Sequence, residues 1–533
     1  MATDLTDLRA EEDLFSDAGG DAGNGAEELT APVSAPDGPA NPEESHRFCS
    51  RFFERLAVVE LGGEHPGLQQ CLVESLQHGL TLTTDYSGLG TAEEAMRQIV
   101  EACQAHVACE MVDPLSQAAF ASHHATDVDK HCRSILMHHA EPWRPQCLFR
   151  DILERTPGFA QKLLESERLE ILDEIGLGEK SRKRKAPGTF TSAIAERGRG
   201  FIQKAVTLLL KNMPKDGPKA LCGRHARNCC VNPAVPLQSE LGPKPLILHV
   251  SGFNCYDWSS MGVGLKFLGP SSLPFAQWVA ERKRFQEPIV VAECTMNFDF
   301  FHLQKMMEPE YPSEKSFALR VSPVMLGEPV ERVRMYMFFL SNEMTWRQSE
   351  SVERQTAGWA SDLFVRIFHH NVVMSPCDKF QGPEEMVRDF IKKTAMKQHL
   401  PPSTSSGKEW SFVQACSSAV QEKIEMHNAW LHADLAANEM VFEPENWVCN
   451  LWQTPAFMAP SYKKVPCLLR GSHLYLFKQK RCALELELLE VQGWCMFDTA
   501  APAGVAVGQR GSSLVVLLVY FLRLTNSFAL LGD

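Results

Sequence analysis

The sequence predicts an α/β fold built around a mostly parallel sheet. From about residue 46 onward, short apolar runs alternate with stretches of helical periodicity, and several of the runs end at a glycine-rich turn or a polar side chain. Buried strands separated by helices are typical of parallel sheets with helices on both faces. Ligands bind at the carboxyl ends of the strands in such sheets, so the residues that end each apolar run are the candidates for function.

Six strands are expected. In chain order they span residues 80–86, 106–111, 147–152, 246–255, 288–294 and 331–340. The stretch AEEAMRQIVEACQ after the first strand is expected to be a helix, and a second helix is expected around residues 191–212. This second helix belongs to an insert of roughly residues 176–245 between the third and fourth strands.

The rest of the chain divides by composition. Residues 46–345 form the main domain with its insert, whereas residues 346–465 are less periodic and contain breakers such as HLPPSTSSGKEW. We expect a second, smaller region there. Residues 466–533 are expected to return to the main domain, and their last stretch is atypical.

Charge is distributed unevenly along the 533 residues. The net charge is −13, but residues 1–45 hold twelve Asp and Glu against one Arg, and residues 180–230 hold thirteen Lys and Arg against Glu196 and Asp216. The acidic tail has few large apolar residues, so we expect residues 1–45 to be disordered. The negative net charge does not exclude a nucleic-acid partner, because the basic insert is suited to phosphate contacts.

The cysteines and the N-terminus indicate the compartment. The seventeen cysteines form no regular framework, and the first residues lack the basic start and apolar core of a signal peptide. We expect a reducing compartment with free thiols. The run KSRKRK resembles a nuclear import signal, so the nucleus is expected, with the cytoplasm as the alternative. The apolar run Leu514–Leu522 has nine residues, and a membrane span needs about twenty, so no membrane partner is expected.

The first candidate site is a glycine-rich turn. Tyr86 ends the first strand, and Ser87-Gly88-Leu89-Gly90-Thr91 leads into a helix whose N-terminus offers free amides. Glu110 lies twenty-two residues beyond Gly88 at the end of the second expected strand, where an acidic residue can hold ribose hydroxyls. Together these features favour an adenosine-containing ligand, with Asp151 at the third strand end suited to the base.

Two further strand ends carry reactive side chains. Cys255 follows the fourth strand in GFNCYDWS, where a thiol can act as a nucleophile if its surroundings favour the thiolate. A buried structural cysteine is the alternative. Glu293 ends the fifth strand in VVAEC, and a carboxyl group there is a candidate proton donor, with a solvated strand cap as the alternative.

Arg332 and Arg334 alternate in GEPVERVRMYMFF. Alternate residues of a strand share one face, so two guanidinium groups there can orient a substrate or a carboxylate. A solvated strand edge would leave both arginines without such a role.

Other clusters indicate no site. The segment CGRHARNCC (222–230) contains metal-ligand residue types, but their spacing is irregular for zinc, so we interpret it as a basic surface loop with free thiols and expect no metal. The pairs His123-His124 and His138-His139 are interpreted as surface residues. Trp447, Trp452 and Phe457 suit either base stacking or a core.

Taken in order, these motifs resemble the C-5 cytosine-specific DNA methyltransferase family. DYSGLGT is similar to its first motif, Glu110 in ACEM to its second, and Asp151-Ile152 to its third. GFNCYDWSSMG resembles its Pro-Cys loop, AEC its Glu-Asn-Val motif, EPVERVRMYMFF its paired-arginine motif, and ALELELLEVQGW its late helix. The resemblance spans about residues 80–495 and preserves the order of the motifs.

The resemblance implies an S-adenosylmethionine-dependent methyltransferase with a Rossmann-like fold and a target-recognition region in 346–465. Cys255 would attack carbon 6 of cytosine, Glu293 would hydrogen-bond ring nitrogen 3, and Arg334, with Arg332, would steady the flipped base. The residues implied in cofactor binding are Tyr86, Ser87, Gly88, Leu89, Gly90, Thr91, Glu110, Met111, Asp151 and Ile152.

The sequence also departs from the family pattern. Phe253 and Asn254 stand where the family has two prolines before the nucleophile, and Val330 stands where it has a glutamine. No final asparagine-containing motif follows Trp494. Methyl transfer to DNA is the expected function. The alternatives are the same reaction on tRNA or other RNA, and an inactive relative that binds nucleic acid or protein.

Overall fold

The computed structural model of the chain describes most of the two predicted regions. The described residues are 35–46, 79–107, 120–177, 191–234, 246–259, 262–344, 364–365, 368–402, 407–468 and 472–492. Among them, no helix combines the length and the apolar character that crossing a membrane requires.

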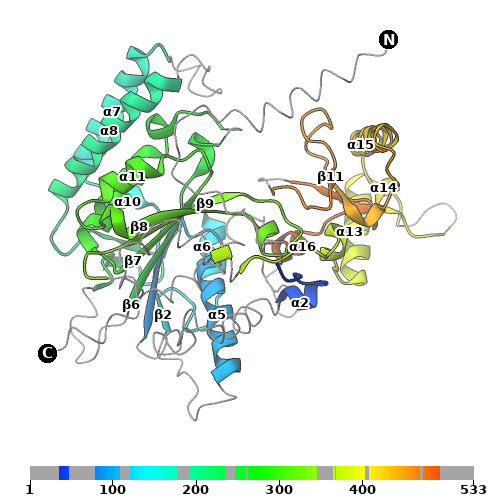
Figure 1. Cartoon of the computed structure of the whole chain (residues 1–533), viewed down its shortest axis with the longest axis horizontal. Helices are drawn as coiled ribbons and strands as arrows, with labels where there is room; N and C mark the ends of the chain where they lie inside the picture. The colour runs from blue at the N-terminus through cyan, green and yellow to red at the C-terminus, as the bar shows by residue number, and fades with distance from the viewer. Residues whose placement is uncertain are drawn as a thin grey trace.

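A seven-stranded sheet forms the centre of the main domain (Figure 1), in the order β3-β2-β1-β6-β7-β9-β8. Its strands are β1 (Leu80–Asp85), β2 (Phe120–Thr126), β3 (Cys147–Phe149), β6 (Leu246–Gly252), β7 (Ile289–Cys294), β8 (Ser316–Val321) and β9 (Arg334–Leu340). Strand β9 is antiparallel to both of its neighbours, β7 and β8, and it is the one strand of this sheet that runs against the others. The predicted α/β fold class with a mostly parallel sheet is therefore confirmed.

Five of the six expected strands lie within the predicted ranges, and the second prediction is wrong. His106 and Val107 end helix α5 (Thr91–Val107), and the strand that pairs with β1 is β2 instead. Helical periodicity continues through QAHV, so the apolar residues there extend a helix. The prediction that His123 and His124 lie on the surface is also wrong, because both are buried in β2. Strand β8 was not expected.

Helices cover both faces of the central sheet (Figure 1). They are α5, α6 (Lys130–Leu136), α7 (Gly158–Glu174), α8 (Thr191–Asn212), α10 (Ser272–Phe285) and α11 (Phe300–Met307). The helix expected around residues 191–212 is α8, which packs on α10. A large apolar cluster joins α7, α8, α10 and α11 to the sheet, whereas α5 lies on the other side.

The second region has its own core. A four-stranded sheet in the order β11-β10-β12-β13 packs with helices α13, α14 and α15. The bounds are α13 (Glu384–Lys397), α14 (Phe412–Ala415), α15 (Ser418–Ala437), β10 (Trp447–Asn450), β11 (Ser461–Tyr462), β12 (Leu474–Leu476) and β13 (Arg481–Cys482). The sheet thus continues beyond residue 465. Helix α16 (Glu485–Glu490) lies in the segment that resembles the family's late helix.

The end of the acidic tail is ordered. Helix α2 (Pro42–His46) lies within residues 35–46, and Gly38 N–H donates to the Asn371 carbonyl at 2.8 Å. Ser45 Oγ donates to Glu328, which also pairs with Lys379 at 2.7 Å. The prediction of disorder is therefore wrong for residues 35–45, because polar contacts compensate for their lack of large apolar side chains. Residues 1–34 and the whole run KSRKRK lie outside the described residues.

Candidate active site

Cys255 lies just beyond the carboxyl end of β6. Asn254 caps the short 3-10 helix η6 (Cys255–Asp257) through its side-chain oxygen, which accepts the Tyr256 N–H at 3.1 Å. The Cys255 carbonyl accepts the amides of Trp258 and Ser259 at 3.0 and 2.7 Å. These bonds fix the backbone of the turn while the Cys255 side chain stays half-buried. The thiol is therefore held in place and remains accessible.

Glu293 lies beside this turn because strands β6 and β7 are paired. Gly252 is in register with Glu293, and Phe253 N–H donates to the Glu293 carbonyl at 2.9 Å. The Glu293 side chain is 8% exposed and accepts from Arg334 Nε at 3.0 Å. Since Arg334 begins β9, which pairs with β7, three strands bring a thiol, a carboxylate and a guanidinium to one edge of the sheet.

Burial and nearby side chains both affect the pKa values at this edge. Burial lowers the pKa of Arg334, but its pairing with Glu293 and the nearby Cys467 and Cys255 outweigh burial, so the pKa is raised. Burial raises the pKa of the neighbouring Cys294 thiol, and Glu293 and Cys255 raise it further. Cys294 is therefore a poor nucleophile, whereas Cys255 and Cys467 are both half-buried.

Arg332 lies outside β9, on the segment that precedes it. Its Nη1 lies 3.9 Å from Cys467 Sγ, and Arg334 Nη2 lies 3.8 Å from the same sulfur. The two arginines thus approach one point, as expected for alternate residues. Cys467 follows Val465, which forms an isolated bridge with Val330. The sequence did not indicate Cys467.

The glycine-rich turn lies at the end of the adjacent strand β1. Tyr86, Gly88 and Gly90 all have positive φ angles (55°, 58° and 88°), so the chain reverses sharply before α5 begins at Thr91. Ser87 Oγ accepts the Thr126 N–H at 2.9 Å, which ties the turn to the end of β2. A Cβ on Gly90 would lie 2.8 Å from the His139 ring, so only glycine fits there.

Asp127 is a candidate site residue that the sequence analysis missed. It follows β2, is 8% exposed, and its Oδ2 accepts the Gly88 N–H at 2.7 Å. An acidic residue at the end of the second strand was expected, but at Glu110. Glu110 and Met111 lie outside the described residues. The signal that could have found Asp127 is the Asp that directly follows FASHHAT.

Asp151 and Ile152 follow β3. Asp151 is half-buried and caps the 3-10 helix η3 (Ile152–Arg155) by accepting the Leu153 N–H at 2.9 Å, whereas Ile152 is buried. Asp151 is thus at the same edge as the glycine-rich turn, with its carboxylate engaged in a local cap.

A small hollow of about 10 Å³ lies between Tyr86 of the glycine-rich turn and the turn that carries Cys255. Tyr86 and Phe253 line it, with their rings edge to face at 6.0 Å, and Asn254, Trp258 and Lys266 are also in its wall. The hollow is about the size of one water molecule. Asn254, the residue before Cys255, is the part of the Cys255 turn that borders it.

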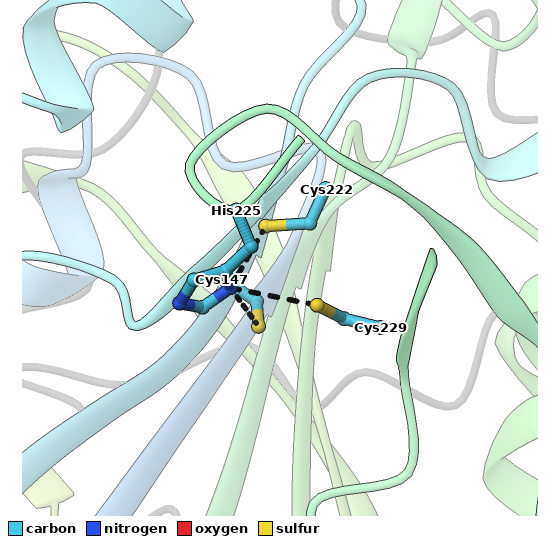
Figure 2. Close-up of side chains that lie close together, drawn as sticks. All are labelled: Cys147, Cys222, His225 and Cys229. Atoms are coloured by element: carbon cyan, nitrogen blue, oxygen red, sulfur yellow. Dashed lines mark hydrogen bonds between the residues drawn. The ribbon is translucent and has the colours of Figure 1, made fainter. Parts of the chain in front are cut away.

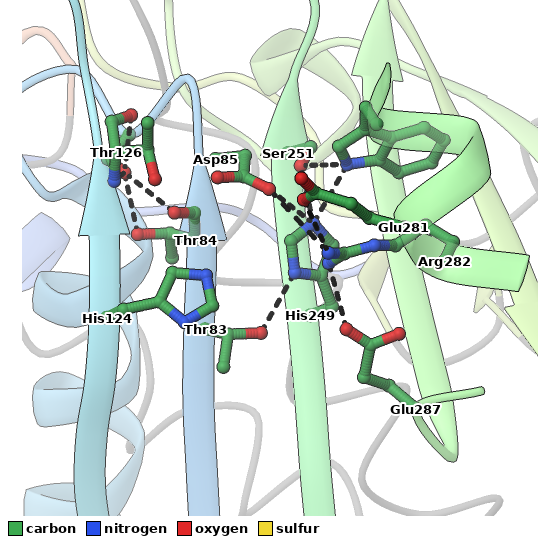
Figure 3. A network of polar contacts seen from close by, with 12 residues as sticks. Thr83, Thr84, Asp85, His124, Thr126, His249, Ser251, Glu281, Arg282 and Glu287 are labelled. Carbon is green, nitrogen blue, oxygen red and sulfur yellow. Dashed lines mark hydrogen bonds and ion pairs between the residues drawn. The ribbon is translucent and has the colours of Figure 1, made fainter. Parts of the chain in front are cut away.

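A buried polar network supports the strand ends (Figure 3). Asp85 at the end of β1 pairs with Arg155 Nη1 at 3.1 Å, and the same nitrogen pairs with Glu281 at 2.9 Å. Burial alone would raise the pKa of Asp85, but the charges of Arg155 and Arg282 outweigh it and hold the pKa at about 2. Asp85 therefore stays ionised directly below the glycine-rich turn.

His249 of β6 links this network to α10. Burial lowers the pKa of His249 well below its usual value, so its ring is neutral. Trp278 Nε1–H lies 2.9 Å from His249 Nε2 and 2.7 Å from Ser251 Oγ, and His249 Nδ1 is hydrogen-bonded to Thr83 Oγ1 at 2.9 Å. These bonds join β1, β6 and α10 into one rigid base for the site.

Glu93 of α5 gives a pH-dependent prediction. Its carboxyl is fully buried and accepts from Thr84 Oγ1 at 3.0 Å, and burial raises its pKa to about 7. The folded chain thus holds this proton more tightly than the unfolded chain, so this group's contribution to stability falls as pH rises from about 4.5 to about 7. Glu93→Gln is expected to increase the free energy of unfolding at pH 8 by roughly 1–3 kcal/mol, as measured by urea denaturation.

Glu94→Gln is the control for Glu93→Gln. The Glu94 carboxylate pairs with Arg97 at 2.6 Å, so removal of the Glu94 charge is not expected to stabilise the fold at pH 8. A Glu93→Gln protein that is less stable than wild type at pH 8 would contradict the buried-charge account.

Comparisons with known proteins give limited overlap. No protein-family model matches the chain, and no curated protein matches it. Among solved structures, Spodoptera frugiperda DNMT2 (a mutant form) aligns with a TM-score of 0.30 and 10% identity, over 84% of this chain and 98% of that one. S. pombe Dnmt2 methyltransferase aligns with a TM-score of 0.26 and 8% identity, over 57% of this chain and 60% of that one.

A protein described as a DNA modification methyltransferase encoded within a prophage (E. coli) aligns with a TM-score of 0.24 and 12% identity. That alignment covers 50% of this chain and 47% of that chain, so the chain spans about half of its length. Overlaps at these TM-scores do not assign an activity. The residues of the chain itself are therefore the basis for its proposed function.

Proposed function

We propose that this protein transfers a methyl group from S-adenosylmethionine to carbon 5 of cytosine in DNA, through a covalent adduct with Cys255. The observation that carries the proposal is the convergence of Cys255, Glu293 and Arg334 at the ends of three paired strands. The order of the sequence motifs supports it independently, since each of these residues comes from a different motif.

The chemistry follows from the groups present. The Cys255 thiolate adds to carbon 6 of the ring, which makes carbon 5 nucleophilic. In its protonated form, Glu293 would donate a hydrogen bond to ring nitrogen 3 and withdraw electron density from carbon 6. Once carbon 5 carries the methyl group, it would lose its proton to water, and the double bond between carbons 5 and 6 would re-form as the bond from carbon 6 to sulfur breaks and frees Cys255. Arg334 Nε, 3.0 Å from Glu293 Oε1, would hold the carboxyl group in position.

S-adenosylmethionine supplies the methyl group when it is bound. The residues present fit such a group: a turn with two glycines at positive φ follows β1, and acidic side chains follow β2 and β3. We assign binding to the turn Tyr86–Thr91 together with Asp127 and Asp151. Ile152 would pack beneath them.

Nucleic acid is the proposed substrate because the ordered motifs resemble those of enzymes that act on cytosine in DNA, and a base in a duplex reaches an active-site thiol by flipping out. The second region offers exposed aromatic side chains for base contacts. Trp452 is 61% exposed and stacks on His473, and Phe457 is 54% exposed, whereas Trp447 is buried in the core. We propose the second region as the target-recognition region.

The test is methyl transfer from isotopically labelled S-adenosylmethionine to duplex DNA and to tRNA, run side by side. The proposal predicts label on carbon 5 of cytosine in DNA. Label confined to tRNA would show that RNA is the substrate, with the chemistry as proposed. Cofactor binding without transfer to either substrate would favour the inactive relative, and label on an adenine would overturn the proposal.

Glu293→Gln is expected to lower the rate of methyl transfer by roughly 10²–10⁴-fold, because the amide cannot supply a proton to ring nitrogen 3. The change is nearly isosteric and keeps a polar group beside Arg334. Single-turnover assays with saturating cofactor measure the effect. Glu331→Gln is the control, since Glu331 pairs with Lys464 at the surface, and equal losses in both variants would argue against a catalytic role for Glu293.

A further inference from the structure

A group of four potential metal ligands lies at the edge strand β3, which β2 and β1 separate from β6 (Figure 2). Cys147 begins β3, and Cys222, His225 and Cys229 belong to a hairpin of the basic insert, formed by β4 (Lys219–Cys222) and β5 (Arg227–Cys230). Their ligand atoms all lie within 4.8 Å of one another. The site is separate from the residues assigned to catalysis.

The distances within the group match a tetrahedral metal site. His225 Nδ1 lies 3.6 Å from Cys147 Sγ, 3.5 Å from Cys222 Sγ and 3.4 Å from Cys229 Sγ. Zinc bonds of about 2.3 Å to sulfur and about 2.0 Å to nitrogen place these atoms about 3.6 Å apart in a tetrahedron. All three nitrogen-to-sulfur distances are close to that value.

Hydrogen bonding alone does not explain this convergence. A neutral imidazole nitrogen has a single lone pair, so Nδ1 can accept from one thiol and not from three. The three cysteines are free, and none forms a disulfide. One cation at the centre of the group would satisfy all four ligand atoms at once.

The surroundings also suit a bound metal. Leu148 N–H points at Cys222 Sγ at 3.4 Å, as amides do toward metal-bound thiolates. Gly223 N–H donates to the Leu148 carbonyl at 2.7 Å, and Ala226 N–H donates to the Cys222 carbonyl at 2.8 Å. The positive φ of Ala226, 52°, closes the turn that presents His225.

We propose that Cys147, Cys222, His225 and Cys229 bind one zinc ion, which fastens the β4–β5 hairpin to the edge strand β3. Three sulfur ligands and one nitrogen select zinc among common metals, and a full set of four protein ligands is typical of a structural site. The cysteines release their protons to solvent when the metal binds. The ion would cover an otherwise open sheet edge and hold the strand that leads to Asp151.

Metal analysis of the full-length protein, purified without a metal-affinity step, tests the proposal. About one zinc per chain is expected for wild type. Cys222→Ser and Cys229→Ser are expected to lower the zinc content at least roughly tenfold. Cys230→Ser is the matched control, because Cys230 is next in the chain but its Sγ donates to the Asp216 carbonyl at 3.4 Å. That variant should keep its zinc.

A second test uses the wild-type protein alone, so its result does not depend on whether the variants fold. After zinc removal, cobalt(II) is expected to produce the visible bands of a tetrahedral thiolate site, and zinc is expected to abolish them. Wild type that purifies without zinc and gives no such bands would overturn the proposal, as would full zinc content in folded Cys222→Ser. Neither assay involves substrate, so either result is independent of the proposed methyl transfer.

Discussion

Replacement of Cys255 by alanine is expected to lower methyl transfer by at least roughly a thousandfold, because the covalent route has no other nucleophile. Cofactor binding should be unchanged, since the glycine-rich turn keeps its own contacts to β2. Transfer to duplex DNA and calorimetric binding of S-adenosylmethionine, measured on the same preparation, separate the two effects. Loss of both would indicate a folding defect and not a missing nucleophile.

Two other thiols at the site provide the controls for this prediction. Cys294 is fully buried, and burial raises its pKa, whereas Cys467 contacts the guanidinium groups of Arg332 and Arg334. Cys294→Ala and Cys467→Ala are expected to retain measurable transfer. If Cys467→Ala abolished transfer while Cys255→Ala retained it, Cys467 would be the nucleophile and our assignment would be wrong.

Replacement of Arg155 by methionine is expected to destabilise the fold by roughly 3–5 kcal/mol, because it leaves buried carboxylates without their partner. Arg155, Asp85 and Glu281 have fully buried side chains, and the guanidinium also lies 5.1 Å from the centre of the Phe149 ring. Arg282 is 3.8 Å from Asp85 and 3.5 Å from Glu281, too far to replace the closer contacts. Thermal and urea denaturation measure the loss.

Arg150→Met is the matched control, five residues earlier in the same connection. Its guanidinium is 65% exposed and pairs with Glu154, so a change of about 0–1 kcal/mol is expected. Similar losses in both variants would show that the buried network contributes no more than a surface ion pair. The comparison therefore tests whether the network stabilises the strand ends that carry the site.

The sequence predicted the fold class because alternating apolar runs and helices specify a parallel sheet with little dependence on detail. The sequence also indicated Cys255 and Glu293, which follow or end clear apolar runs, and Arg334, which begins one. The register of β6 with β7 and of β7 with β9 brings these positions to one edge of the sheet, and their catalytic roles stay predictions.

Other residues could not be predicted because their patterns are misleading or their partners are distant. Strand β2 has the sequence FASHHAT, and its two histidines give it a polar pattern although both are buried. The strand was therefore not predicted, and Asp127 at its end was missed. Cys147 lies 78 residues before His225, which is why the hairpin cysteines alone had irregular spacing for zinc. Arg155 and Glu281 are 126 residues apart, and no local pattern indicates such a pair.

Covalent trapping tests the central claim most directly. Fluorine at carbon 5 of cytosine cannot leave as a proton does, so an enzyme that methylates through a cysteine adduct stays attached to 5-fluorocytosine DNA. With S-adenosylmethionine present, we expect wild type to form an adduct that resists denaturation and Cys255→Ala to form none. Wild type that binds the cofactor but forms no adduct on duplex DNA or tRNA, or an adduct that persists in Cys255→Ala, would contradict the account.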